Sequence, residues 1–158
     1  MDEPPCLGER ELGAWRALLS TAATLNRLIE QRLKDDAGLS HSQYEVLVRL
    51  ADAPGGELRM TELAGAATTS KSGLTYQVAQ LEKAGLVRRR ACPEDVRGII
   101  ASLTDEGWAK VRATEPGHAA LVRDLFVDGL SRDDFTALAG GLEALRDLLH
   151  TRSGDQAS

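Results

Sequence analysis

Basic side chains are concentrated in one stretch of the sequence, residues 68–104. This stretch holds six basic and three acidic residues, whereas the whole chain holds 19 basic and 24 acidic residues and carries a formal net charge of −5. Basic side chains pair with phosphates, and hydroxyl and amide groups hydrogen-bond to phosphates or to the edges of bases. The total charge argues against a nucleic-acid partner, but this local basic stretch is compatible with one.

Polar side chains in this stretch fall on one side of a helix predicted over residues 70–84. Leu74, Val78 and Leu81 recur at steps of four and three residues and form a single apolar seam. An exposed helix is polar in any protein, but the charge pairs typical of a solvated face are sparse before Glu82. The groups on the other face that can contact DNA are Ser70, Lys71, Ser72, Thr75, Tyr76 and Gln77.

A β-hairpin is predicted directly after this helix. The hydrophobic pattern changes from a helical to an alternating period, which gives strands at residues 86–91 and 99–103 and a turn over residues 92–98. Arg97, an arginine in such a turn, can enter the minor groove of DNA, where the narrow cleft concentrates negative potential. Asp95 lies two residues away and either holds that guanidinium in place or simply pairs with it. The alternative interpretation is a solvated charged turn.

Helical patterns flank this region on both sides. Apolar residues at three- and four-residue steps predict a long helix over residues 9–34, and Ser40 with Gln43 has the spacing of a capping box that opens a second helix. A fifth helix follows the hairpin, and Pro116 should kink or break it. A sixth helix carries an apolar stripe to its end, and residues 151–158 are predicted to be a flexible tail.

The order of these elements predicts a mainly α protein with a small β-hairpin wing. This is a winged helix-turn-helix joined to an α-helical dimerisation region. The apolar stripes of the first and sixth helices are too long for a small winged domain to cover, which predicts an interface with a second copy. The alternative is that the terminal helices of one chain pack on each other. The predicted parts are a flexible N-terminus (1–8), a dimerisation helix (9–38), the winged domain (40–104), C-terminal dimerisation helices (105–150) and a flexible tail (151–158).

Four linked motifs make the sequence similar to the multiple-antibiotic-resistance regulator (MarR) family. They are SKSGLT at 70–75, LEKAGLVRR at 81–89, DVRG at 95–98 and LTDEG at 103–107, and the helix order extends the resemblance over roughly residues 9–150. The resemblance implies a homodimeric, sequence-specific transcriptional regulator, more often a repressor, on a pseudo-palindromic operator in double-stranded DNA. It places the helix over residues 70–84 in the major groove and the wing in the flanking minor groove.

The resemblance also assigns contacts residue by residue. Arg97 becomes the wing arginine and Asp95 the carboxylate that positions it. The candidates for the major groove are Ser70, Ser72, Thr75 and Gln77, and those for phosphates or the base of the wing are Arg88, Arg89 and Arg90.

A small phenolic or aromatic effector is implied as well, since many members of the family release DNA when such a ligand binds between the winged domain and the dimer helices. Each candidate for this pocket also suits an ordinary core position. The candidates are Trp15, His41, Tyr44 and Trp108.

A zinc-responsive branch of the family gives an alternative effector. The candidate ligands are Glu30, His41 and His118, with Asp35 or Asp36 as further oxygen donors. Zinc prefers three or four convergent ligands, and the sequence lacks a pair of histidines four residues apart on the fifth helix. Cys6 and Cys92 have no metal-ligand spacing and are predicted to be reduced thiols, with a redox-sensing role left open.

Other classes of protein match the sequence less well. No apolar run approaches the roughly 18 residues of a membrane span, and the acidic N-terminus lacks the regions of a signal peptide, so a cytoplasmic protein without a membrane partner is predicted. Glycine-rich phosphate loops, nucleophile elbows and catalytic His/Cys/Asp sets are missing, so an enzyme is not predicted. A winged-helix adaptor that binds only proteins is the alternative to a DNA-binding regulator.

Overall fold

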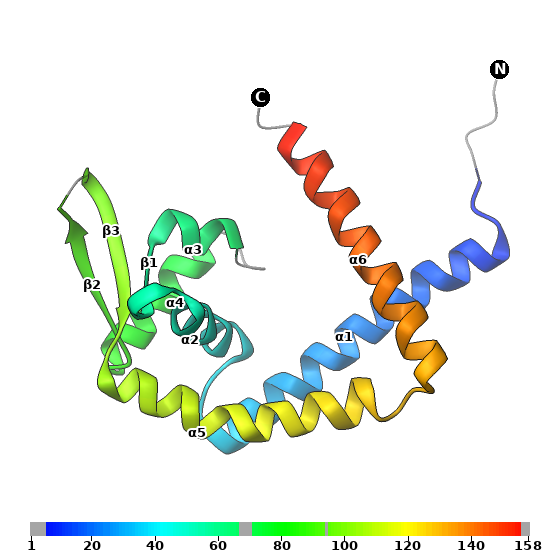
Figure 1. Cartoon of the computed structure of the whole chain (residues 1–158), viewed down its shortest axis with the longest axis horizontal. Helices are drawn as coiled ribbons and strands as arrows, with labels where there is room; N and C mark the ends of the chain where they lie inside the picture. The colour runs from blue at the N-terminus through cyan, green and yellow to red at the C-terminus, as the bar shows by residue number, and fades with distance from the viewer. Residues whose placement is uncertain (1–5, 67–70, 94, 156–158) are drawn as a thin grey trace. The chain divides into compact units, whose positions relative to one another are not determined.

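The computed structural model describes residues 6–66, 71–93 and 95–155 (Figure 1). The chain divides into two compact units, Met1–His118 and Ala119–Ser158. The predicted fold class is confirmed, because the chain is mostly helical with one small antiparallel sheet. The elements in chain order are α1 (Glu9–Ala37), α2 (His41–Asp52), the 3-10 turn η1 (Pro54–Gly56), β1 (Glu57–Arg59), α3 (Met60–Ala66), α4 (Lys71–Lys83), β2 (Val87–Cys92), β3 (Asp95–Leu103), α5 (Asp105–Val122), the π turn η2 (Arg123–Val127) and α6 (Arg132–Asp155).

The junction between α1 and α2 follows local sequence signals. Gly38 adopts the left-handed conformation at φ 67° and ends α1, a conformation that glycine reaches without steric cost. The backbone N–H of Gln43 donates to Ser40 Oγ at 3.1 Å, and the N–H of Ser40 donates to Gln43 Oε1 at 3.0 Å. This reciprocal pair is the predicted capping box, and it fixes the point at which α2 begins.

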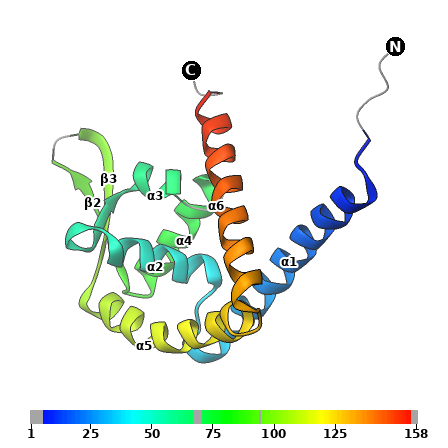
Figure 2. The ribbon, with the colours of Figure 1, turned by 45° about the vertical axis from the view of Figure 1, so that its right-hand side comes forward.

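The sheet has three strands, in the order β1-β3-β2, where a two-stranded hairpin was predicted. The third strand is β1, directly before α3, and it pairs with β3 so that Leu58 lies opposite Ala101. The predicted turn over residues 92–98 is wrong, because β3 already begins at Asp95, which pairs with Cys92 after a register shift next to Ala91. Asp95 and Arg97 therefore lie on a strand, and the hairpin of β2 and β3 extends beside the helices of the first unit as a long ribbon (Figure 2).

The apolar seam of α4 is part of the main core. Leu74, Val78 and Leu81 are at most 1% exposed, as their spacing predicts. They share one cluster with residues of the other helices and of the sheet, including Leu47, Leu50, Leu63 and Ala101. Because burying this seam fixes the rotation of α4 about its axis, the face opposite the seam is directed away from the core.

The start of α5 is fixed to the segment between α4 and β2. The Thr104 N–H donates to the carbonyl oxygen of Leu86 at 3.1 Å, and Thr104 Oγ1 donates to that of Gly85 at 2.7 Å. The N–H of Gly107 in turn donates to Thr104 Oγ1 at 3.0 Å. A Cβ atom on Gly107 would overlap the Leu86 carbonyl oxygen, so the close approach of the two backbones requires glycine at this position.

Helix α5 is not broken where a break was predicted, and α6 runs further than predicted. Helix α5 continues through Pro116, so the predicted break is absent. The prolyl nitrogen carries no hydrogen, so the helix lacks one backbone hydrogen bond there. Val111 and Thr114, on the turns before Pro116, are buried. In the second unit, Ser131 Oγ accepts from the N–H of Asp134 at the start of α6. The tail predicted from residue 151 is wrong in part, because α6 extends to Asp155. None of the helices among residues 6–66, 71–93 and 95–155 combines the length and the apolar character needed to span a membrane.

Candidate nucleic-acid interface and candidate ligand cavity

Helix α4 exposes a polar face around one aromatic ring. Ser72, Thr75 and Tyr76 are exposed, and Gln77 lies half-buried at the side of this face. Ser70, the first of the predicted contacts, lies outside the described residues. Lys71 is the first residue of α4, and only its backbone belongs to the described structure. The described part of this face therefore offers hydroxyl, amide and aromatic groups to a partner.

Arg89 links the wing to α4. Its Nε donates to Glu82 Oε2 at 2.8 Å, its backbone N–H donates to Glu82 Oε1 at 2.9 Å, and its Nη2 lies 2.6 Å from Glu82 Oε2. These hydrogen bonds lower the pKa of the Glu82 carboxyl below its usual value, because they favour the ionised form. Arg89 was predicted to contact phosphates or to support the base of the wing; in this structure it holds β2 to the end of α4.

The other two arginines of β2 differ from each other. Arg90 Nη2 donates to both carboxylate oxygens of Glu57 on β1, at 2.9 and 3.0 Å, and this pair spans the sheet. Arg88 is exposed, as is Arg97 on β3. Neither of these two forms a side-chain ion pair within the described part of the chain. Arg88 and Arg97 are therefore the wing arginines whose charge is available to an anionic partner.

Asp95 organises the tip of the wing through backbone as well as side-chain contacts. Its Oδ1 accepts a hydrogen bond from the backbone N–H of Arg97 at 3.0 Å, and its Oδ2 lies 3.9 Å from Arg59 Nη1 on β1. The expected pairing of Asp95 with the Arg97 guanidinium is not observed between these described residues. Asp95 fixes the backbone of the strand that carries Arg97, whose side chain is exposed.

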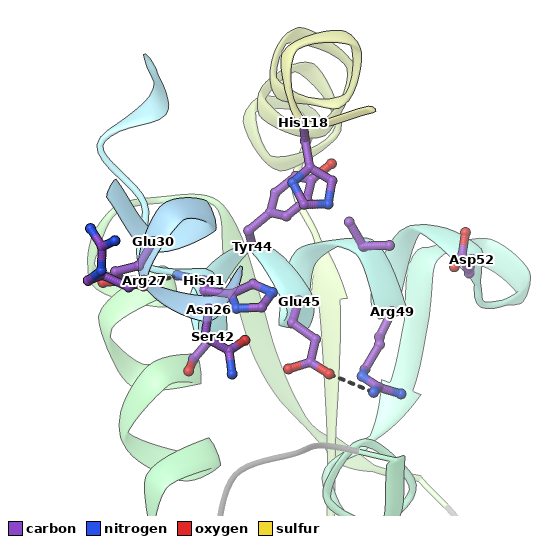
Figure 3. A pocket seen from close by; sticks show the side chains of 11 residues that line it. Asn26, Arg27, Glu30, His41, Ser42, Tyr44, Glu45, Arg49, Asp52 and His118 are labelled. Carbon is purple, nitrogen blue, oxygen red and sulfur yellow. Dashed lines mark hydrogen bonds and ion pairs between the residues drawn. The ribbon is translucent and has the colours of Figure 1, made fainter. Parts of the chain in front are cut away.

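A cavity of about 830 Å³ lies in the first unit, where its lining comes from the C-terminal part of α1, from α2 and from α5 (Figure 3). It brings together His41, Tyr44 and His118, which were predicted as candidates for an effector or a metal. The other two effector candidates lie elsewhere. Trp15 is 52% exposed on α1, and the Trp108 ring occupies the space beside Gly56, where a Cβ atom would come within 2.7 Å of it.

His118 has an unusual environment in this cavity. Its ring centroid lies 4.8 Å from that of Tyr44, and its Nδ1 is buried without a hydrogen-bond partner in the described structure. Burial lowers the pKa of His118, and the nearby His41 lowers it further. Burial also raises the pKa of Tyr44, with a smaller contribution from the charge of Glu115. Both shifts favour the neutral form of the side chain.

Arg49 provides a second polar group in the same cavity. One of its terminal nitrogens donates to Glu45 Oε1 at 2.7 Å, as Figure 3 shows, whereas its Nε is buried without a partner in the described structure. Glu45 and Arg49 belong to no sequence motif and were not predicted as site residues. They line the cavity because α1, α2 and α5 fold together. The one feature of the sequence that could have indicated them is a row of polar residues along one face of α2.

The candidate zinc ligands do not gather around a common point. Glu30 Oε2 accepts from the backbone N–H of His41 at 2.6 Å, which lowers the pKa of the Glu30 carboxyl, and Glu30 Oε1 lies 3.1 Å from Lys34 Nζ. Within residues 6–66, 71–93 and 95–155, no three His, Cys, Asp or Glu side chains are grouped as metal ligands. Asp35 and Asp36 bind Gln31 and Arg32 on the same helix. The zinc alternative therefore receives no support from these residues.

The cysteines lie in different surroundings. Cys6 is exposed and Cys92 is buried, and both are free thiols. Cys92 pairs with Asp95 at the register shift of the wing, and a Cβ atom added to Gly98 would come within 2.9 Å of its Cβ. The buried thiol packs as a small apolar side chain beneath the wing tip, which is the common behaviour of an unreactive cysteine.

Comparison with known proteins gives the family of this fold. A family model described as "MarR family" matches residues 39–99. The crystal structure of Sco3205, a MarR family transcriptional regulator from Streptomyces coelicolor in complex with DNA, superposes with a TM-score of 0.87 and 41% identity, covering 93% of this chain and 92% of Sco3205. The chain belongs to the MarR family.

Further relatives agree with this assignment. AbsC, a MarR family transcriptional regulator from Streptomyces coelicolor, has a TM-score of 0.86 and 37% identity, covering 94% of this chain and 99% of AbsC. The transcriptional repressor YetL from Bacillus subtilis is 33% identical over 102 residues, which are 65% of this chain and 60% of YetL. The match therefore spans less than two thirds of YetL. The MarR relatives named here are transcriptional regulators rather than enzymes.

Proposed function

We propose that this chain is a sequence-specific DNA-binding transcriptional regulator, acting as a repressor on a pseudo-palindromic operator. The observation that carries the proposal is the joint geometry of α4 and the wing. The outer face of α4 carries groups that can bond to base edges, and Glu82 with Arg89 holds it at a fixed position relative to the hairpin. The hairpin presents Arg88 and Arg97, whose charge is available to phosphates or to the minor groove. Support comes from the DNA complex of Sco3205 and from the repressor YetL.

A homodimer is part of the proposal. Helix α6 carries large apolar residues at alternating steps of three and four, which is the heptad spacing of a helix that packs along a partner helix. The four leucines among these apolar residues are between 37% and 53% exposed, so the single chain leaves this row of side chains largely uncovered. The residues of this stripe, called the α6 stripe below, are Phe135, Leu138, Leu142, Leu145 and Leu149. A second copy with two-fold symmetry would cover it and would give one winged domain for each operator half-site.

The test begins with selection of bound duplexes from a random DNA library by the purified protein. The enriched sequence should contain an inverted repeat, and fluorescence anisotropy should give its affinity at two salt concentrations. Changing Arg97 to Ala should weaken binding at least about ten-fold, because each half-site loses a groove contact. Arg132→Ala, at an exposed arginine at the start of α6, is the matched control and should leave the affinity within about two-fold. If no duplex is enriched at low salt, a winged-helix adaptor for proteins replaces the DNA-binding regulator.

We further propose that a small phenolic or other aromatic molecule regulates DNA binding from the cavity between α1, α2 and α5. The cavity volume lies within the range of ordinary small-molecule sites. His118 Nδ1 and Arg49 Nε are buried without partners in the described structure, and a polar ligand group would satisfy them. The rings of Tyr44 and His118 supply an apolar surface against which an aromatic ring can stack.

A thermal-shift screen of phenols and aromatic carboxylic acids tests the effector proposal. A compound that binds the folded chain should stabilise it by about 2.7 kcal/mol when its free concentration is roughly 100 times its Kd. The same compound should weaken the complex with the selected duplex. His118→Gln should abolish this response while leaving the affinity for DNA without ligand unchanged. His150→Gln, at an exposed histidine on α6, should respond as the unmodified protein does. An equal response of His118→Gln would place the effector elsewhere.

A further inference from the structure

One aromatic side chain occupies the centre of the outer face of α4. Successive residues of an α-helix are rotated by about 100°, so Tyr76 lies about 200° from both Leu74 and Val78, opposite the buried seam. Its exposed fraction is 61%, whereas those two residues are 1% and 0% exposed. Within the described residues the Tyr76 hydroxyl has no hydrogen-bond partner and its ring contacts no other aromatic ring. The core and the fold therefore do not explain why this position holds a large ring.

Most neighbours of Tyr76 along the same face are small. The positions one turn away on a helix surface are three and four residues distant, and they hold Ser72, Gly73, Ala79 and Gln80; only Gln80 among them is large, and it is half-buried. The ring therefore extends beyond the surface formed by its neighbours. In a helix that enters the major groove, the most protruding side chain of the central turn is the one that reaches the base edges first.

The chemistry of the ring limits what it can recognise there. The major-groove edges of base pairs carry hydrogen-bond donors and acceptors, and the single apolar group among them is the C5 methyl of thymine. Hydroxyl and amide side chains match the donors and acceptors, whereas the edge or face of an aromatic ring matches the methyl group. Burial of a methyl group between the ring and the groove removes apolar surface from water and is favourable.

We propose that Tyr76 is a specificity-determining residue that recognises a thymine methyl group in each operator half-site by contact with its aromatic ring. This inference rests on the proposed function, because it requires α4 to lie in the major groove. It assigns to Tyr76 a role that differs from those of its polar neighbours. The ring carries the preference for thymine, and the hydroxyl is not required for it.

The experiment uses the full chain and the duplex enriched in the selection described above. Each thymine of one half-site, and its symmetry mate, is replaced in turn by deoxyuridine, which removes the C5 methyl and leaves every hydrogen-bonding group in place. Affinities are measured by fluorescence anisotropy for the unmodified protein, for Tyr76→Phe and for Tyr76→Ala. Because Tyr76 is exposed, both variants should keep the thermal unfolding midpoint of the unmodified protein, which is measured as the folding control.

The expected result is a coupling between one thymine position and the ring. At that position the loss of one methyl group should weaken binding by the unmodified protein and by Tyr76→Phe about four-fold per half-site. Tyr76→Ala should bind the thymine and deoxyuridine duplexes equally well, and it should be weaker than the unmodified protein only on the thymine duplex.

Two results would overturn the inference in distinguishable ways. If Tyr76→Phe loses as much affinity as Tyr76→Ala and no deoxyuridine position depends on the ring, the hydroxyl bonds to a phosphate or a base, and the inference fails while the proposed function stands. If the selection enriches no duplex at all, the proposed function fails and this inference fails with it.

Discussion

Replacing Gly107 with alanine should destabilise the winged domain more than a glycine-to-alanine change at any other described glycine. The added Cβ atom would overlap the backbone carbonyl oxygen of Leu86, and it would also come within 3.0 Å of a Leu103 side-chain carbon. A flexible side chain can rotate away from a new methyl group, but a carbonyl oxygen in a hydrogen-bonded backbone cannot. We expect a loss of about 3 kcal/mol or more, at the upper end of the range for overpacked sites.

The expected loss follows from what the Leu86 backbone holds together. Its carbonyl oxygen accepts the N–H of Thr104, and the Thr104 hydroxyl in turn joins Gly85 to Gly107. Movement of Leu86 would therefore break the contacts that fix the start of α5 to the base of the wing. Urea unfolding followed by circular dichroism measures the change in free energy of unfolding, and the midpoint of thermal unfolding should fall by roughly 6 to 12 °C.

Gly65→Ala is the matched control for this prediction. It is the same chemical change in helix α3 of the same unit, and no atom of the described residues lies within 4 Å of the Cβ position. Alanine has the higher helix propensity, so this variant should be neutral or more stable by up to about 1 kcal/mol. Equal stability of Gly107→Ala and the unmodified protein would contradict the described approach of α5 to the Leu86 backbone.

The comparison of sequence and structure shows which features are local. The Gly38 stop, the Ser40 capping box and the seam of α4 were all predictable, because each depends on residues within about two turns of one another. The wing was predicted as a hairpin for the same reason. Its turn was placed too broadly because the sequence shows a proline and charged residues there, whereas the register shift near Cys92 allows pairing to resume at Asp95.

The features that were missed depend on residues far apart in the chain. Residues 57–59 are too short to signal a strand, and they become β1 only because the free edge of β3 lies beside them. Glu57 and Arg90 are also far apart in the chain, 33 residues, so the sequence could not distinguish Arg90, which is paired, from Arg88, which is exposed. The cavity around His118 has the same origin, since its walls come from α1, α2 and α5. For the proposed DNA-binding surface, the sequence pattern thus predicted which faces are exposed but not which charged side chains are already paired within the chain.

A charge within the α6 stripe should convert the proposed dimer into a monomer. Leu145 lies in the middle of the stripe and is 37% exposed in the single chain, so glutamate at this position is tolerated by the folded monomer. In a dimer the same carboxylate would be buried against apolar residues of the partner and would lose its hydration. Light scattering coupled to size-exclusion chromatography should give a mass near the 17.0 kDa of one chain for Leu145→Glu.

Loss of the dimer should also remove most of the affinity for DNA. Two linked winged domains bind an inverted repeat more tightly than one by a factor of about 10² to 10⁴, because the second half-site is bound within the same complex. Leu145→Glu should therefore bind the selected duplex at least about 100-fold more weakly, although it lies on α6 and leaves α4 and the wing unchanged. Ala144→Glu adds the same charge to the adjacent, exposed position outside the stripe and should keep both the mass of a dimer and the affinity. A dimeric Leu145→Glu would show that another surface joins the two copies, and a monomer with full affinity would show that one winged domain suffices for binding.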